Sequence, residues 1–252
     1  MKKLLLLSLF VNLFPASVAL AEDIDAQVAW SQRVELTTGV SGTVAKVNVQ
    51  VGDRVKAGEQ LLVLDQNLFR ASLSRAMAQE KDAQYKLKEA EREWERAREL
   101  YDRTVLSDRD LQLAENDLVS AQADMATATA ALTHAKHNLA ESVVRAPMNA
   151  IVLERQAEPG QAVVNKLQVT PLITVASADS YLARGEVSAS TADELAAGQA
   201  VSVTVAGTRY KGKVFSVGLE PVGQGNTYPL SIQFSAGNKT LRAGEPAIIH
   251  LP

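Results

Sequence analysis

Apolar residues recur at alternating steps of three and four residues along two neighbouring stretches of the chain. Such steps average 3.5 residues, the repeat of helices that supercoil left-handedly around each other. The break between the two series, at roughly 104–108, is long enough only for a tight reversal, so the pattern predicts an antiparallel coiled-coil hairpin over 67–142. The first series is Phe69, Leu73, Ala76, Ala83, Leu87, Ala90, Trp94, Ala97 and Tyr101; the second is Leu111, Ala114, Leu118, Ala121, Met125, Ala128, Leu132, Ala135 and Leu139.

Alanine fills one whole layer of this predicted seam. With Leu73 and Leu111 at heptad position a, every d position in both helices is alanine. Small side chains let two helix backbones approach closely, so the hairpin should be thin and stiff. Helices of this length should reach about 50 Å.

The segments on either side of the hairpin have the character of strands. Residues 37–66 and 143–175 both contain β-branched runs broken by glycine-containing turns, such as Gly52-Asp53 in the first half and Pro159-Gly160 in the second. These features favour short strands joined by tight turns. Two matching halves predict one small β-sandwich that the hairpin splits.

The remaining segments, 22–36 and 176–252, alternate in several short runs around one short helix. This layout predicts a small β-barrel. The fold class is therefore mainly β, with a long α-helical hairpin inserted in a sandwich and a separate barrel domain.

Residues 1–21 have the pattern of a secretory signal peptide, with Lys2 and Lys3 before an apolar run and Ala19-Leu20-Ala21 before Glu22. Asn12 and Pro15 interrupt the apolar run, which is shorter than the roughly 20 residues of a membrane span. We expect cleavage and export to the periplasm; an uncleaved anchor is the alternative. The chain has no cysteine, which excludes disulfides, thiolate chemistry and attachment as a lipoprotein.

Candidate chemistry is sparse. The net charge of −3 argues against nucleic acid as a partner. His134 and His137 lie one turn apart on the outer helix face without a third ligand fixed by the sequence, so a solvated pair is favoured over a metal site. His250 lies in the last predicted strand, and no nucleophile motif accompanies it. We predict a protein without enzymatic activity or cofactor.

The split halves resemble the half-motif of lipoyl and biotinyl carrier domains. The two halves interrupted by a hairpin, with the re-entry Arg145-Ala146-Pro147, resemble the periplasmic adaptor (membrane fusion protein, HlyD-like) family of tripartite efflux pumps. The turn at 64–68 has no lysine to modify, so carrier chemistry is not expected. Asn149-Ala150 stands where that family usually has Asp-Gly. Family members usually continue into a membrane-proximal domain, which we expect to be absent or reduced here.

The hairpin tip carries part of this resemblance. Arg96, Leu100, Ser107 and Leu111 match the spacing of the adaptor tip motif, which implies docking onto a TolC-type outer-membrane channel. Arg96 and Leu100 lie beside the seam, and we expect both to face outward one turn apart. The alternative is a solvated arginine with an incidental surface leucine.

The outer face of the second helix is small and nearly neutral, at Ala123, Ala126, Thr127 and Ala130. We expect it to pack sideways against the next hairpin in a homo-oligomeric ring, a trimer or a hexamer. The alternative is that these alanines only favour helix formation.

The resemblance implies an adaptor that links an inner-membrane transporter, of the RND class, to the outer-membrane channel and supports export of drugs or other small molecules. Two alternatives remain open: an adaptor of an ABC-type exporter, and a periplasmic scaffold or binding protein without a channel partner.

Overall fold

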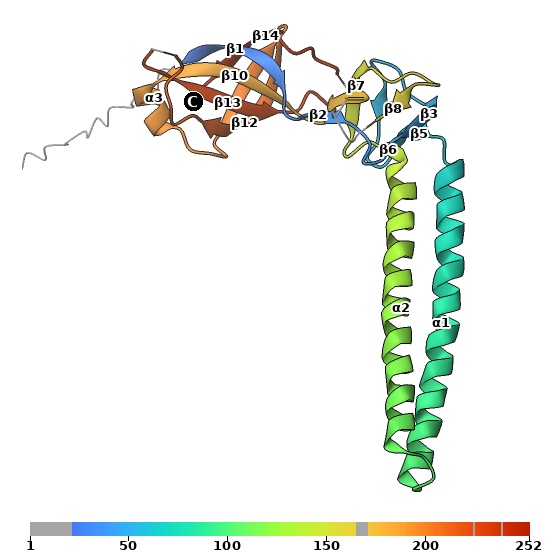
Figure 1. Ribbon diagram of the computed structural model, residues 1–252. Coiled ribbons are helices and arrows are strands. Elements are labelled where there is room, and N and C mark those ends of the chain that lie inside the picture. The colour runs from blue at the N-terminus through green and yellow to red at the C-terminus, as the bar shows by residue number, and fades with distance from the viewer. Residues whose placement is uncertain (1–21, 165–170, 224, 238) are drawn as a thin grey trace, which may run out of the picture. The chain divides into compact units, whose positions relative to one another are not determined.

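The computed structural model describes residues 22–164, 171–223, 225–237 and 239–252 (Figure 1). The predicted signal peptide at 1–21 lies outside the described residues. The chain divides into two compact units: Gln32–Asp179, and the described part of Met1–Ser31 together with Ser180–Pro252. Among the described residues, no helix is both long and apolar enough to cross a lipid bilayer.

The unit Gln32–Asp179 contains a sandwich of two four-stranded antiparallel sheets, with the orders β2-β9-β7-β4 and β6-β5-β3-β8. Its core is built from side chains of both halves, among them Leu61, Leu64, Ile173 and Val175, all completely buried. The strands are β2 (Arg33–Leu36), β3 (Gly42–Val47), β4 (Arg54–Val55), β5 (Gln60–Leu64), β6 (Val143–Arg145), β7 (Ala150–Arg155), β8 (Ala162–Val163) and β9 (Ile173–Ser177).

Two long helices, α1 (Asn67–Asp102) and α2 (Asp108–Glu141), interrupt the sandwich and lie side by side (Figure 1). The helical hairpin runs where the apolar series predicted it. Its most buried members belong to the alanine layer or lie directly against it: Ala76, Ala83, Ala121, Leu132 and Ala135. The other alanines of the layer are half-buried, as expected for a seam that only two helices cover.

The hairpin is joined to the sandwich by hydrogen bonds at both helix ends. The Leu64 N–H donates to the Ser142 carbonyl at 2.8 Å, and the Gln66 amide donates to the Ser142 hydroxyl at 2.8 Å. The Thr38 hydroxyl donates to the Glu141 carbonyl at 2.8 Å. Ser142 and Thr38 are buried, and the ring of Phe69 in the first turn of α1 packs against the sandwich core. These contacts fix the start of α1 and the end of α2, the base of the hairpin, on the sandwich.

Asn149-Ala150, which departs from the family's Asp-Gly, forms an ordinary turn. Among the described non-glycine residues, positive φ occurs at Thr104 and Ala206 only, so neither Asn149 nor Ala150 is left-handed. The Asn149 side chain accepts from the Ala57 N–H at 3.2 Å and donates to the Asp179 carboxylate at 3.1 Å. The asparagine thus links three loops of the sandwich, and β7 begins directly after it.

The second unit is a closed antiparallel barrel in the order β1-β10-β13-β12-β11-β14. A row of aromatic rings lies in its core: Trp30, Tyr181, Phe234 and Tyr210 have successive ring centroids 5.4, 5.9 and 5.6 Å apart. Its elements are β1 (Asp23–Trp30), β10 (Tyr181–Ser188), α3 (Ala189–Glu194), β11 (Ala200–Val205), β12 (Thr208–Val217), β13 (Thr227–Phe234) and β14 (Pro246–His250).

The structure moves both predicted domain boundaries. Residues 33–36, which we assigned to the barrel, form β2 and pair with β9 in the sandwich, where Val34 lies opposite Val175. Strand β9 continues to Ser177, so residues 176–179 also belong to the sandwich unit rather than to the barrel. The alternation of apolar and polar residues is the same whichever sheet a strand joins, so the pattern alone does not identify the partner.

The seam predicts how the hairpin responds to a larger side chain. Ala76 is buried against Leu132 and Ala135, so Ala76→Leu must force the helices apart and should lower the free energy of unfolding by about 1–3 kcal/mol. Ala78→Leu, on the exposed side of α1, should change it by less than about 0.5 kcal/mol. Thermal unfolding followed by circular dichroism at 222 nm measures both. Equal effects at the two positions would contradict the close seam.

Candidate docking surfaces of the hairpin and barrel

The connection between α1 and α2 is tight and partly strained. The Thr104 N–H donates to the Tyr101 carbonyl at 2.8 Å, and the Val105 N–H donates to the Leu100 carbonyl at 2.9 Å. Thr104 has a φ of 60°, a left-handed conformation that a β-branched residue rarely adopts. The turn therefore terminates α1 by bonding its last carbonyls, and it presents Val105 to solvent with 70% of its surface exposed.

Ser107 is the N-cap of α2. Its hydroxyl accepts from the Asp110 N–H at 3.3 Å and donates to the Asp110 carboxylate at 2.7 Å. Asp108 and Asp110 also place negative charge in the first turn, where the helix dipole favours it. Ser107 thus has a structural role at the tip, besides the docking role that the motif implies.

Leu100 does not face outward as we expected. It is half-buried, whereas Tyr101, which the repeat placed on the seam, is 39% exposed. The reason lies at the end of α1, where the chain turns. The repeat implied a step of four residues from Ala97 to Tyr101, whereas the seam takes a step of three, from Ala97 to Leu100. Leu111 is half-buried as well. The exposed apolar residues near the tip are Tyr101, Val105 and Leu113, which sequence reasoning did not select.

Arg96 does face outward. Its guanidinium forms an ion pair with Glu93 at 2.6 Å, and most of its side chain remains exposed. An exposed pair of this kind contributes no more than about 1 kcal/mol, so Arg96 can exchange Glu93 for an acceptor on another protein at little cost.

The neutral face of α2 has two parts. Ala126 and Ala130 line a shallow depression together with His134 and His137. Thr127 lies instead at a groove between the helices, next to Ala83 and the Lys86–Asp82 ion pair. The hydrogen bond that the Lys86 ammonium donates to the Asp82 carboxylate raises the pKa of Lys86. Ala123, the fourth predicted residue, is exposed, and its carbonyl accepts from the Thr127 hydroxyl at 3.0 Å.

The histidines of α2 remain on the surface. Both His134 and His137 are exposed, and the His134 ring lies 3.3 Å from the Asn138 amide nitrogen. In the described part of the chain, no three His, Cys, Asp or Glu side chains gather as a metal site would need.

His250 has partners that the sequence did not reveal. Its Nδ1 lies 2.5 Å from the Asp23 carboxylate, and its Nε2 lies 2.8 Å from the Thr204 hydroxyl. The sequence of contacts from Asp23 through His250 to Thr204 resembles a catalytic triad. However, β11 pairs with β12 along one edge and with β14 along the other. The backbone N–H groups around Thr204 are therefore used in the sheet and do not form an oxyanion hole. The three side chains link strands β1, β14 and β11.

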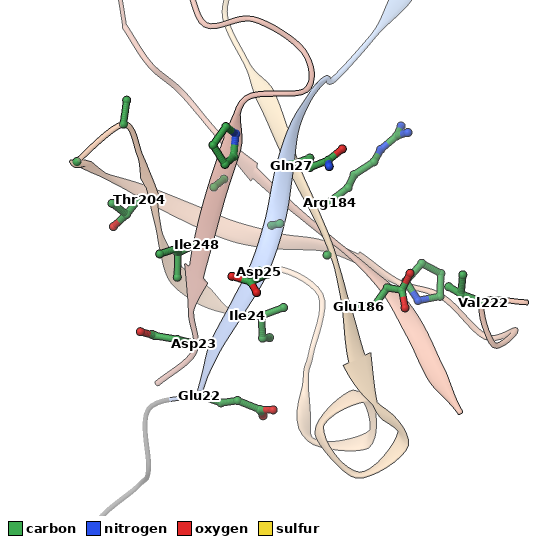
Figure 2. A pocket seen from close by; sticks show the side chains of 17 residues that line it. Glu22, Asp23, Ile24, Asp25, Gln27, Arg184, Glu186, Thr204, Val222 and Ile248 are labelled. Carbon is green, nitrogen blue, oxygen red and sulfur yellow. The ribbon is translucent and has the colours of Figure 1, made fainter. Parts of the chain in front are cut away.

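The outer wall of the barrel is hollowed beside these residues (Figure 2). Strands β1, β10, β11 and β14 line the hollow, and its charged side chains are Glu22, Asp23, Asp25, Glu186 and Arg184. Ile248 lies among them with 39% of its surface exposed.

A comparison with protein families identifies the sandwich and its hairpin. Residues 32–176, more than half of the chain, match the model of the "CzcB-like, barrel-sandwich hybrid domain". This range coincides within three residues with the unit Gln32–Asp179. The chain belongs to the CzcB-like family.

Two relatives of this CzcB-like protein have names that refer to export or efflux. The chain is 28% identical over 239 residues to the macrolide export protein MacA of Escherichia coli O157:H7, across 87% of the chain and 64% of MacA. It is 29% identical over 169 residues to the efflux pump periplasmic linker BepD of Brucella suis biovar 1, across 67% of the chain and 43% of BepD. The chain therefore spans less than two thirds of the length of these relatives.

Solved structures share the fold. The membrane fusion protein Spr0693 of Streptococcus pneumoniae R6 superposes with a TM-score of 0.69 at 19% identity, over 90% of this chain and 97% of that protein. The family match and the named relatives, together with this shared fold, confirm the resemblance to membrane fusion proteins that the split halves and hairpin indicated. The shared fold also confirms the mainly β class with an inserted hairpin.

The cap predicts distinct effects at Ser107. Ser107→Ala removes the side-chain acceptor of the Asp110 N–H and leaves only the Ser107 carbonyl, which accepts at 3.1 Å. The loss should cost about 1 kcal/mol locally, so that amide should exchange with solvent about fivefold faster. Ser107→Asn keeps an acceptor and a donor at the same place and should preserve the protection. Hydrogen exchange at the first turn of α2 measures the difference. Unchanged protection in Ser107→Ala would exclude the capping role.

Proposed function

We propose that this CzcB-like chain is a non-catalytic periplasmic adaptor that links an inner-membrane transporter to a TolC-type outer-membrane channel. It would support the export of drugs or other small molecules. The observation that carries the proposal is the long hairpin, whose base is fixed on the sandwich and whose far end is a capped, partly apolar tip.

The attachment of the hairpin suits a mechanical role. Four anchoring contacts, from Leu64, Gln66, Thr38 and Phe69, fix the ends of α1 and α2 on the sandwich core. A rod fixed in this way transmits force and position between its two ends. The energy for transport would come from the transporter, because an adaptor contributes coupling and sealing and makes no bonds.

The tip would divide its tasks among its residues. Arg96 supplies an exposed cation for an acceptor on the channel, and Tyr101 and Val105 supply exposed apolar surface beside it. The half-buried Leu100 and Leu111 and the capping Ser107 hold the turn in shape. In this assignment, the four motif residues act as one contact residue and three positioning residues.

For the inner-membrane partner we propose an RND-class transporter, with an ABC-type exporter as the second candidate. The relative BepD, named an efflux pump periplasmic linker, supports an efflux role, and MacA, which matches 87% of the chain, is named a macrolide export protein. Purification of the chain from crosslinked membranes, followed by identification of a proton-driven permease or an ATPase, separates the two classes.

The tip gives a direct test of function. In a strain that lacks this gene, the wild-type gene should restore resistance to a panel of compounds that includes macrolides, and Arg96→Asp should lose most of that resistance because the cation is reversed. Arg92→Asp is the matched control, since Arg92 is exposed and pairs with Glu89 one turn below. It should retain most of the resistance.

A photo-crosslinking residue at Val105 should capture an outer-membrane channel in the same strain. If Val105 crosslinks only to other proteins and Arg96→Asp leaves resistance unaffected, the adaptor function is rejected. A periplasmic scaffold protein without a channel partner is then favoured.

The neutral face of α2 would pack against a neighbouring hairpin in a ring. The double variant Ala126→Glu/Ala130→Glu puts two charges into its shallow depression and should lower the oligomer fraction in sedimentation. Ala71→Glu/Ala78→Glu, on the exposed side of α1, is the matched control and should leave the oligomer intact. An oligomer that survives the first pair of charges excludes this packing.

A further inference from the structure

One side of the barrel is acidic. Along β1 the exposed Asp23 and Asp25 alternate with the buried Ile24 and Ala26, so both carboxylates lie on the outer wall. Glu22 and Glu186 extend the acidic surface around the hollow, in which Arg184 is the cation (Figure 2). We call this surface the acidic hollow.

Another side of the barrel is basic. Along β12 the exposed Arg209, Lys211 and Lys213 alternate with the half-buried Tyr210 and the buried Gly212, so the three cations share the outer face of one strand. We call them the basic stripe. Phe215 follows, 56% exposed, at a β-bulge between Val214 and Ser216 that turns an additional side chain outward.

The barrel topology places the acidic hollow and the basic stripe on different sides of the barrel, and the strand registers place them at the same height along it. Strands β1 and β12 are three strands apart in either direction around the six-stranded barrel. The pairing registers connect Asp25 through Ile248 and Thr204 to Arg209. They connect Asp23 through His250 and Ser202 to Lys211 in the same way. Opposite charges thus lie on the same rungs of the sheet, on different sides of the barrel.

These charges are not neutralised within the barrel. Across the described residues, Asp25, Lys211 and Lys213 form no ion pair, and Asp23 pairs with His250. Glu186 accepts from the Thr227 hydroxyl, and Arg209 donates to the Ser202 hydroxyl, so both keep their net charge. Each surface therefore presents charge of predominantly one sign to whatever approaches it.

We propose that the acidic hollow of one copy receives the basic stripe of a second copy of this chain. The observation that selects a second copy is charge complementarity, since both members of the matching pair belong to one barrel. Each surface would repel its own kind, and the two surfaces lie on different sides of the barrel, so one interface cannot contain both. The contact must therefore be head-to-tail rather than two-fold symmetric. Exposed Ile248 in the hollow and Phe215 beside the stripe add apolar surface to the contact. This inference deepens the ring assembly of the proposed function and rests on it.

Charge reversal with mixing tests the contact. Asp25→Lys should make the hollow more basic, and Lys211→Glu/Lys213→Glu should make the stripe acidic. At about 50 mM salt, where screening is weak, each variant of the full chain alone should associate at least about tenfold more weakly than wild type. An equimolar mixture of the two variants should associate again, because the unchanged hollow of one variant meets the unchanged stripe of the other. Sedimentation velocity measures all four samples.

Two matched controls fix the interpretation. Glu194→Lys on α3 repeats the charge change of the first variant, and Lys239→Glu/Arg242→Glu in the loop before β14 repeats that of the second. Both lie outside the two surfaces and should associate as wild type does. Raising the salt to about 500 mM should dissociate the barrel contact, whereas it should affect the uncharged packing of α2 much less.

Several outcomes would overturn the proposal. It fails if wild type remains monomeric at low salt, if the mixture of variants does not recover, or if only the Asp25→Lys variant weakens association. The last result would assign the hollow to a different, basic partner protein. Resistance in the deletion strain is scored separately: variants that leave both association and resistance unchanged reject this contact alone, while the tip substitutions continue to test the adaptor function.

Discussion

The pairing of β5 with β6 is the constraint on which the rest of the hairpin depends. Strand β5 leads into α1, α2 leads into β6, and the two strands lie next to each other with Val63 opposite Val143. Adjacent strands are about 4.8 Å apart, whereas packed helices are usually about 8–10 Å apart. Two helices that leave neighbouring strands therefore start at the same edge of the sheet and run side by side (Figure 1). The alanine layer along the seam suits this arrangement, because its small side chains let the helices stay close along their length.

The same constraint explains why the ends of the hairpin are polar and buried at once. A helix that starts at the edge of a sheet leaves backbone groups without helical partners, and they must be bonded if they are buried. Ser142 meets this need at the end of α2, where its carbonyl accepts from Leu64 and its hydroxyl accepts from Gln66. At the tip, where both helices meet solvent, the free backbone groups are bonded locally. Ser107 accepts from the first turn of α2, and the turn at Thr104 bonds the last carbonyls of α1.

The barrel follows a different physical logic. Its interior is held by aromatic and branched side chains, so its outer wall is free to carry charge without a cost to the core. Alternation along β1 and β12 places those charges outside, and closure of the barrel sets the two signs on different sides. Surface charge of this kind governs specificity and rates of association more than the stability of the fold. It therefore contributes little to folding and much to the choice of partner.

The sequence by itself determined the elements that depend on periodicity. The seam, the split sandwich, the barrel and the outward position of Arg96 all follow from side-chain spacing, because helix and strand geometry is local. The tertiary structure alone decided which sheet receives residues 33–36, and that Leu100 and not Tyr101 turns toward the seam. It also decided that His250 meets Asp23 and Thr204, and that the acidic and basic strands of the barrel share the same rungs. These features depend on which distant segments of the chain come into contact in the folded protein. The residues next to a side chain in the sequence do not specify those contacts.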